Sequence, residues 1–565
     1  MTREQCFSVV CFIPLDPNGT KIFGFSEFLA GLALMVLAWT IGDARYRFRV
    51  RTAPIPLQVV TFWVVASLGV LTLLTDLWRA QGWLIPQGNL LTPASWQAIL
   101  ASSFLLTFLS WAWFAFIKRP TFGKRNAERY AQTLYRLILK GDPAELAVVA
   151  DELTYSARAL VHHATDRNKQ NSNRRNQLVD ESEPSSSMVV GYANDLLLLI
   201  ADKRFCRVIV ESSPGTALAI FQEIGEAKKY GIQIEVFAKN IVKEALLNTN
   251  SFLYHETEGY ESGLIGYHKP LSYAMFGNHM MVESIGTLLD TDIMGQSKWD
   301  AAQWEAYCRL VLITLEDYSD KSLWNHSFVL YRATGYIENA VSGLYKLNAV
   351  ANTRENNDVQ CLRVVMQFIS DAVKILEKKG VPIHLRLRVK EEHGHPHESL
   401  YDRIASMIFE VICHASTVSS PQWECWSIQH NSIWSQLRIN LKGPAGRVVK
   451  FKLRRLLYNE VIDLNQFRNF KGAKILSFCL NVMGLNVKKG EYDKDNWPLH
   501  KAILAWTKKR YVWLHYENPH VAEACLVDGI AYDAESLQLV KTYAAGGLQR
   551  EPRYIRLNLE PYTPA

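Results

Sequence analysis

The hydrophobic positions of this chain are concentrated in three long apolar runs near the N-terminus. The runs cover Phe23–Gly42, Ile55–Leu77 and Trp96–Ile117, and none of them contains a lysine or an arginine. A helix needs about 20 apolar residues to cross a hydrocarbon core of ~30 Å at a rise of ~1.5 Å per residue. Each run is long enough, so the pattern predicts three transmembrane α-helices within residues 23–117.

The positive charges beside these runs predict their orientation. One side of the three runs carries Arg45, Arg47, Arg49, Arg51, Lys118, Arg119, Lys124, Arg125 and Arg129. The other side carries Arg3, Lys21 and Arg79. Because segments rich in lysine and arginine stay in the cytoplasm, we expect residues 1–22 outside and residues 118–565 inside. The predicted location is the cell (inner) membrane, with a multi-pass chain embedded in the lipid bilayer.

Charge and composition restrict the class of partner. The chain of 565 residues has a formal net charge of +7, and much of this excess lies in the basic segments beside the runs. Anionic headgroups of the cytoplasmic leaflet attract such segments. The charge is therefore explained without nucleic acid, which we do not expect as a partner.

The remaining pattern predicts a stalk, a linker and a globular region. Apolar residues at helical spacing predict helices in residues 118–164, with a break at Gly141-Asp142-Pro143. Residues 165–187 are strongly polar, which predicts a flexible linker. The predicted domains are an outer tail (1–22), a transmembrane module (23–117), a helical stalk (118–164), the linker (165–187) and a cytoplasmic globular region (188–565). The fold class is an integral membrane protein with three N-terminal transmembrane α-helices and a large α-rich α+β cytoplasmic region containing a small mixed sheet.

One candidate for a binding site is a predicted βαβ segment. Cys206–Glu211 and Ile232–Phe237 are short apolar runs that suggest strands, with a helical pattern between them. In a βαβ unit the turn after the first strand meets a helix N-terminus, whose free N–H groups favour an anion. The candidate ligand-binding residues are Ser212, Ser213, Gly215 and Thr216.

The alternative for this turn is purely structural. Ser213 would cap the following helix and Pro214 would occupy its first position. The spacing matches neither the P-loop nor the dinucleotide-binding fingerprint, and we expect the structural role to be the commoner outcome of such a pattern.

Two histidine-rich segments are further candidates for chemistry. His279 and Glu283 are four residues apart and would share a helix face, but HxxxE lacks the paired-ligand spacing of a metalloprotease. Glu391–Glu398 carries three imidazoles, for which adventitious nickel or zinc affinity is the simpler explanation; they are His393, His395 and His397. We assign no catalytic residue, metal ligand or cofactor from the sequence.

The cysteines divide by the predicted topology. Two of the nine, Cys6 and Cys11, lie in the outer tail and are candidates for a disulfide in an oxidising compartment. The others are widely spaced and form no CxxC pair, so we expect buried free thiols.

Three further segments have local patterns that suggest strand or loop. Val381–Val389 alternates apolar and polar residues and predicts a strand. Leu437–Leu441 and Val448–Leu453 flank a Gly/Pro-containing turn and predict a hairpin. A loop is expected around the tryptophans 423, 426 and 434.

Three classes of function compete. The favoured class is a membrane-anchored sensor, scaffold or effector whose cytoplasmic body binds a small anionic ligand or a protein partner and acts at the membrane. The second is a homo-oligomeric channel or pore, supported by Glu27 in the first run and by small residues such as Gly31 and Gly69. The third is a membrane-tethered enzyme that uses the phosphate-binding turn or the His and Glu cluster. No nucleophile, base and orienting group can be assigned together, which favours a protein that is not an enzyme.

Overall fold

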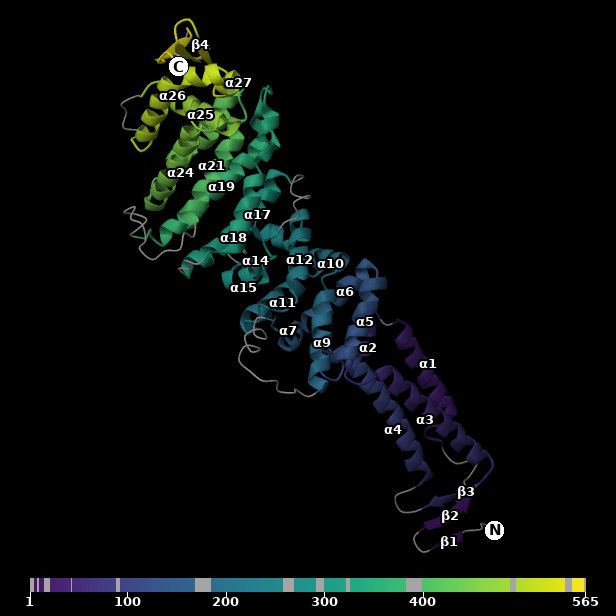
Figure 1. The fold of residues 1–565 in the computed structure, drawn as a ribbon. Coiled ribbons are helices and arrows are strands. Elements are labelled where there is room, and N and C mark those ends of the chain that lie inside the picture. Colours follow the sequence, from purple (N-terminus) through teal and green to yellow (C-terminus); the bar gives the residue numbers. More distant parts are fainter. Residues whose placement is uncertain are drawn as a thin grey trace. The chain divides into compact units, whose positions relative to one another are not determined.

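The computed structural model describes residues 5–7, 10–14, 21–41, 43–87, 92–167, 184–257, 269–290, 299–321, 326–382, 399–487, 494–543 and 551–562 (Figure 1). The described chain is mostly helical and contains two small three-stranded sheets. It forms two compact units, Met1–Glu244 and Ala245–Ala565.

Two helices of the first unit are long and apolar enough to cross a membrane. They are α3 (Leu57–Ala80) and α4 (Pro93–Ala112), which continues as a π-helix, η1 (Trp113–Ile117). The first apolar run forms α1 (Phe25–Ile41), which has 17 residues. Its length is at the lower limit for a transmembrane helix, and a longer span would have to include α2 (Ala44–Thr52), which follows at a bend of 106°. The described residues therefore contain two candidate spans, or three if the bent pair is counted as one.

The three apolar helices bury one face and expose the other. Their interior contains Phe28, Met35, Val65, Leu68 and Leu100. Their outer faces carry large apolar side chains that are at least half exposed, among them Leu34, Phe62, Trp63, Leu106 and Ile117. An exposed apolar surface of this extent indicates an apolar environment or a partner around α1, α3 and α4.

A sheet that the sequence did not predict lies at the end of α3 and α4 away from α2 (Figure 1). It pairs β1 (Gln5–Phe7), β2 (Val10–Pro14) and β3 (Leu84–Gln87), all antiparallel. The register places Cys6 directly opposite Cys11. These strands have three to five residues, too few to produce a recognisable period-2 pattern.

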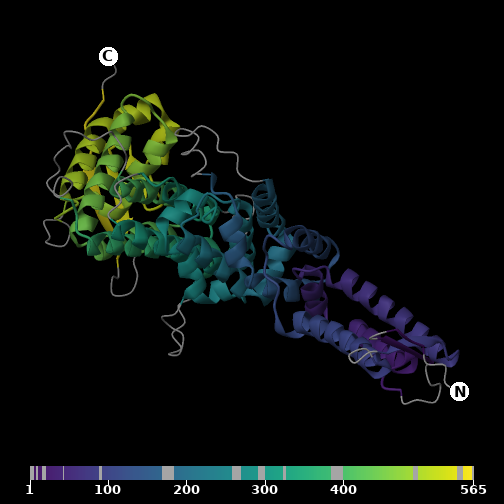
Figure 2. The ribbon, with the colours of Figure 1, turned by 90° about the horizontal axis from the view of Figure 1, so that it is seen from below.

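The remainder of the first unit is a layer of helices, coloured blue in Figures 1 and 2. Its members are α5 (Ala127–Lys140), α6 (Pro143–Thr154), α7 (Ala157–His163), α9 (Pro184–Leu199), α10 (Lys203–Ser212), α11 (Pro214–Ala227) and most of α12 (Glu235–Leu247). The predicted break at Gly141-Asp142-Pro143 is confirmed, and Asp142 caps α6 by accepting the Glu145 N–H at 2.7 Å. The predicted stalk helices pack against α9, α10 and α11 within this layer. The greater part of the predicted linker, residues 168–183, lies outside the described residues.

The predicted βαβ segment is wrong. Cys206–Glu211 lies inside helix α10, whose N-terminus is capped by Asp202. Ile232–Phe237 runs from a turn into the first residues of α12. A short, continuous apolar run does not distinguish a buried strand from a buried helix, and here burial of Phe205, Cys206 and Ile209 on one face of α10 decides for the helix.

The second unit is helical with one sheet. Its longer helices are α17 (Ala301–Asp320), α18 (Phe328–Asn339), α19 (Asn357–Lys378), α21 (Leu400–Ser416), α24 (Pro444–Asp463), α25 (Phe470–Met483) and α26 (Trp497–Glu517). Shorter helices are α13 (Phe252–Thr257), α14 (Pro270–Phe276), α15 (His279–Ile285), η2 (Ser342–Leu347), η3 (Thr353–Glu355), α22 (Gln422–Trp426), η4 (Ser427–Trp434), α23 (Ser435–Asn440) and α27 (Pro519–Ala524). The sheet joins β4 (Ile530–Asp533), β5 (Gln538–Tyr543) and β6 (Arg553–Asn558). It is antiparallel rather than mixed.

Two other local predictions for the second unit are wrong. The predicted tryptophan loop is a continuous helical stretch through α22, η4 and α23, and the predicted hairpin is formed by α23 and α24. Pro444 occupies the first turn of α24, where proline is tolerated. The Gly/Pro segment therefore separates two helices rather than two strands. The Val381–Val389 strand and the Glu391–Glu398 histidines fall on residues 383–398, outside the described residues.

Candidate functional site

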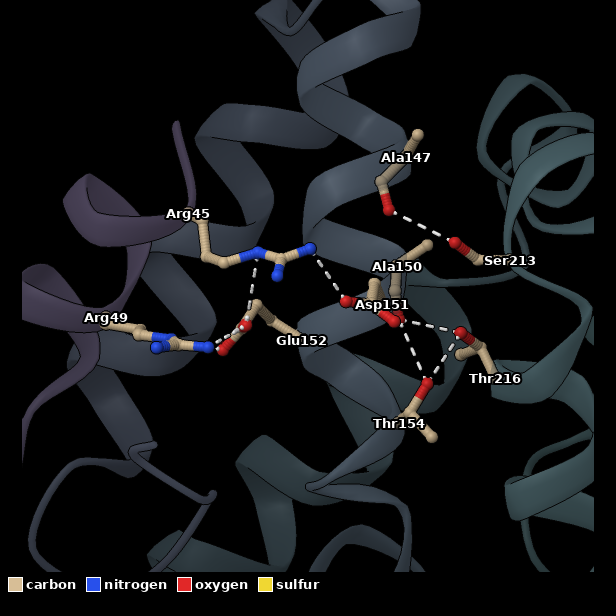
Figure 3. Close-up of polar contacts among 9 residues, drawn as sticks. All are labelled: Arg45, Arg49, Ala147, Ala150, Asp151, Glu152, Thr154, Ser213 and Thr216. Atoms are coloured by element: carbon tan, nitrogen blue, oxygen red, sulfur yellow. Dashed lines mark hydrogen bonds and ion pairs between the residues drawn. The ribbon is translucent and has the colours of Figure 1, made fainter. Parts of the chain in front are cut away.

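Helix α6 carries the most extensive polar junction in the described part of the first unit, and Arg49 and Glu152 form its centre (Figure 3). Arg49 Nε and Nη2 donate to the two oxygens of Glu152 at 2.9 and 2.6 Å. The side chains are 5% and 2% exposed. A two-point guanidinium–carboxylate pair is the strongest common form of ion pair. Hydrogen bonds to Glu152 raise the pKa of Arg49, whereas burial lowers it.

Two more arginines of α2 extend this junction along α6. Arg45 donates to Asp151 at 2.9 Å and lies 3.6 Å from Glu152. Arg47 donates to Glu145 at 3.1 Å. The sequence assigns the four arginines after the first apolar run to lipid headgroups, but three of them have acidic partners on α6.

The same arginine-bearing helix is also fixed to the end of the last apolar helix. Arg49 Nη1 lies 3.4 Å from the carbonyl oxygens of Ala115 and Phe116 in η1. Asn126 donates to the Thr52 carbonyl at 2.6 Å, and Arg129 donates to the Pro54 carbonyl at 2.6 Å. Helix α2 is thus held between the apolar helices and the helical layer.

The opposite side of α6 contacts two of the predicted ligand-binding residues. Thr216 is fully buried, and its hydroxyl donates to the Ala150 carbonyl at 2.7 Å and lies 3.0 Å from the Thr154 hydroxyl. The Ser213 hydroxyl donates to the Ala147 carbonyl at 3.2 Å (Figure 3). These side chains fasten the start of α11 to α6.

The other two predicted residues are exposed and lie beside this contact. Ser212 ends α10, and Gly215 is in the first turn of α11. A Cβ at Gly215 would meet nothing within 4 Å, so packing does not demand a glycine there. The structure brings the four residues together at a helix–helix turn rather than at a strand end. That they bind an anion stays a prediction.

His279 and Glu283 share one face of α15 as predicted, and both contact Ser327, the N-cap residue of α18. The Glu283 carboxylate accepts the Ser327 hydroxyl at 2.8 Å and the N–H groups of Phe328 and Val329 at 3.0 and 3.3 Å. His279 Nε2 lies 3.0 Å from Ser327 Oγ. Burial raises the pKa of Glu283, but the hydrogen bonds from His279, Ser327 and the two backbone groups lower it to about 2. These contacts cap helix α18, which is a structural role.

Two carboxylates near the ends of the apolar runs, Glu27 and Asp76, cap helix α1. Glu27 accepts the Gly24 N–H at 2.9 Å. Asp76 accepts the Phe25 N–H at 2.9 Å and lies 3.6 Å from the Lys21 ammonium. A helix N-terminus favours an anion, so both groups have a local structural partner.

Lys541 is a buried charged group that sequence reasoning missed. Its side chain is 3% exposed, and its ammonium donates to the carbonyl oxygen of Asn481 at 2.5 Å. It lies 5.0 and 5.4 Å from the ring centres of Trp426 and Tyr543. Within the described residues no carboxylate forms an ion pair with it, and burial lowers its pKa to about 8. A lysine at an inward position of β5 was the available signal, but the strand itself was not predicted.

Metal and redox chemistry have no site among the residues that the structure describes. Among them, no group of three or more His, Cys, Asp or Glu side chains is placed to hold a metal. The seven cysteines from Cys206 to Cys525 are free thiols, six of them buried and Cys413 partly buried.

No protein-family model matches this chain, and the comparisons with curated proteins and with solved structures likewise found no match.

Proposed function

We propose that this protein is a membrane-anchored sensor, scaffold or effector, in which α1, α3 and α4 lie in the bilayer and α6 couples them to the helical body. The observation that carries this proposal is the buried Arg49–Glu152 pair. It joins the helix that follows α1 to α6, and the other side of α6 holds α11 through Thr216. A displacement of the apolar helices would be transmitted through packed, two-point contacts.

The proposed topology is the one that the charges indicate. The three apolar helices cross the cell (inner) membrane, the N-terminus is outside and the body is cytoplasmic. The exposed apolar faces of α1, α3 and α4 support embedding in lipid. The cytoplasmic body would bind the anionic ligand or protein partner whose signal is transmitted.

The two other classes have less support. Glu27 caps α1, and the small residues Gly31 and Gly69 face Phe104 and Phe28 of the same chain, so neither observation favours a pore. The His279–Glu283 cluster caps α18, which does not favour an enzyme.

The first test is extraction of native membranes at alkaline pH with the full chain. An integral protein stays in the membrane pellet, and release into the supernatant would contradict the anchor. A reporter fused after Ala565 should be active only in the cytoplasm.

The second test measures coupling by hydrogen exchange of the full chain in detergent micelles. Arg49→Gln should increase exchange in α6 and in the first turns of α11, because Glu152 loses its partner. Arg51→Gln makes the same change at an exposed position of α2 and serves as the control. Equal exchange in both variants would contradict transmission through α6.

A further inference from the structure

A cavity of about 280 Å³ lies where α1, α2, α3 and α4 meet. One part of its wall is apolar and aromatic, with Trp39 from α1, Phe62 from α3 and Trp111 from α4. The other part is polar and comes mainly from the start of α2 and α3. Its polar residues are Tyr46, Arg47 and Gln58.

The apolar wall connects the core of the module to its outer surface. Trp111 is 6% exposed, and its ring centre lies 6.5 Å from that of Trp39. Phe62 is 60% exposed on the outer face of α3. The cavity therefore opens towards the surface that we place in lipid.

The polar wall contains a cation with unused donors. Within the described residues, the Arg47 guanidinium makes one hydrogen bond, from Nη2 to Glu145. A guanidinium has five N–H donors in a planar fork that matches the oxygens of a phosphate. The Arg47 side chain is 54% exposed, so an incoming anion can reach it.

We infer that this cavity binds one anionic phospholipid of the leaflet next to α2. Its phosphate contacts Arg47 and Gln58, and an acyl chain lies along Trp39, Phe62 and Trp111. The apolar wall favours a lipid over free phosphate, because free phosphate has no acyl chain to contact this wall. This inference rests on the proposed function in one respect, which is that α1, α3 and α4 lie in a bilayer.

The position of Arg47 makes the lipid a regulator of the α6 junction. Glu145 and the phosphate are both anions beside one guanidinium and repel each other, so binding of the lipid weakens one of the contacts between α2 and α6. The buried Arg49–Glu152 pair remains in place. The chemistry of the leaflet would then set how firmly the apolar helices are coupled to the body.

The test is a titration of the full chain in detergent with dioleoyl phosphatidylglycerol, with bound lipid counted by native mass spectrometry. Dioleoyl phosphatidylcholine, which has the same chains and no net charge, should bind more weakly. Arg47→Gln should weaken phosphatidylglycerol binding about tenfold, the loss expected for one charged hydrogen bond. Arg51→Gln should leave it unchanged. Equal affinity of the Arg47→Gln variant and the parent chain would overturn the inference.

Glu145→Gln should change the affinity for phosphatidylglycerol in the opposite direction. It removes the anion that repels the phosphate beside Arg47, so phosphatidylglycerol should bind more tightly. Glu128→Gln changes the charge by the same amount at an exposed position of α5 and should have no effect. If both variants strengthen binding equally, the effect is general electrostatics and the local repulsion by Glu145 is refuted.

Two further arms identify the source of the phosphate and separate this inference from the proposed function. Inorganic phosphate should not displace the lipid; displacement at equal concentration would overturn the assignment to a lipid. Failure of Arg47→Gln to act in a chain that stays in the membrane pellet refutes the lipid site alone. Release of the chain from the pellet refutes the anchor, and with it the lipid site.

Discussion

Arg49 of α2 and Glu152 of α6 form a two-point ion pair from which solvent is excluded, although 103 residues separate them in the sequence. The carboxylate also lies 3.6 Å from Arg45. Burying two charges is costly unless their geometry is good and other hydrogen bonds complete it. Here the contacts of Arg49 with Ala115 and Phe116 provide that completion.

Removal of one partner of this pair should destabilise the first unit strongly. Arg49→Met leaves Glu152 buried and incompletely paired, and we expect a loss of about 3 kcal/mol or more in the free energy of unfolding. Combining it with Glu152→Leu should recover most of that loss, because no buried charge remains. Chemical denaturation in mixed micelles, with Arg51→Met as the exposed control, measures both. Losses below about 0.5 kcal/mol for the single variant would mean that the pair behaves as an exposed one.

The small residues in the apolar helices should act within one chain. A Cβ at Gly31 would lie 2.8 Å from Cε1 of Phe104. Gly31→Ala should therefore cost about 1–3 kcal/mol, the usual cost of overpacking, and a second change, Phe104→Leu, should relieve it. Gly191→Ala on α9, where nothing lies within 4 Å of the added carbon, is the control.

A pore built through these residues would behave differently. Gly31→Ala would then change the oligomeric state, measured by light scattering in detergent, and leave the stability of the single chain unaltered. That result would restore the channel as a candidate.

Lys541 should make the stability of the second unit depend on pH in the alkaline range. Its pKa is about 8 in the folded chain and 10.5 in the reference state. Between these values the unfolded chain binds more protons than the folded one, so stability rises with pH. Lys541→Met should remove this rise, and the difference in free energy of unfolding between the two proteins, measured from pH 7 to 10.5, is the readout.

The titratable groups next to Lys541 do not produce this rise in the free energy of unfolding with pH. Burial raises the pKa of Cys425 to about 12 and raises that of Tyr543. Burial also lowers the pKa of Lys474, but that group is present in both proteins and cancels in the difference. A difference that does not change with pH would contradict the assignment of the shift to Lys541.

The parts of the fold that were predictable have long-range patterns, and the parts that were missed depend on tertiary contacts. The apolar runs and the break at Asp142-Pro143 are visible because length, helical spacing and capping chemistry agree. Cys206–Glu211 was mistaken for a strand because six apolar-rich residues fit either structure. Only the burial of one face of α10 distinguishes them.

Only one side of the junction at α6, the arginines of α2, was visible in the sequence. The arginines of α2 stand out in the sequence and were assigned to lipid headgroups, which attract basic clusters beside a membrane span. Nothing local indicates that Asp151 and Glu152, about 100 residues later, pair with them. Likewise, the Ser213–Thr216 turn has the composition of an anion site, while its partners are carbonyl groups of α6 that no local pattern identifies.

The N-terminal sheet offers a test of the proposed topology. Cys6 and Cys11 are direct partners in the β1–β2 register. Opposite residues in an antiparallel pair have Cα atoms about 4.5–5.5 Å apart, within the range that a disulfide bridges. If the N-terminus is outside, an oxidising compartment should join the two cysteines.

Counting the reactive thiols of the denatured chain shows whether this disulfide has formed. Without reductant, seven of the nine cysteines should react, since nine less Cys6 and Cys11 is seven, and with reductant all nine should react. Cys6→Ser should raise the number labelled without reductant to eight, because Cys11 loses its partner while the other thiols are unaffected. Nine labels on the unreduced parent chain would show that the pair is not oxidised and would argue against the proposed orientation.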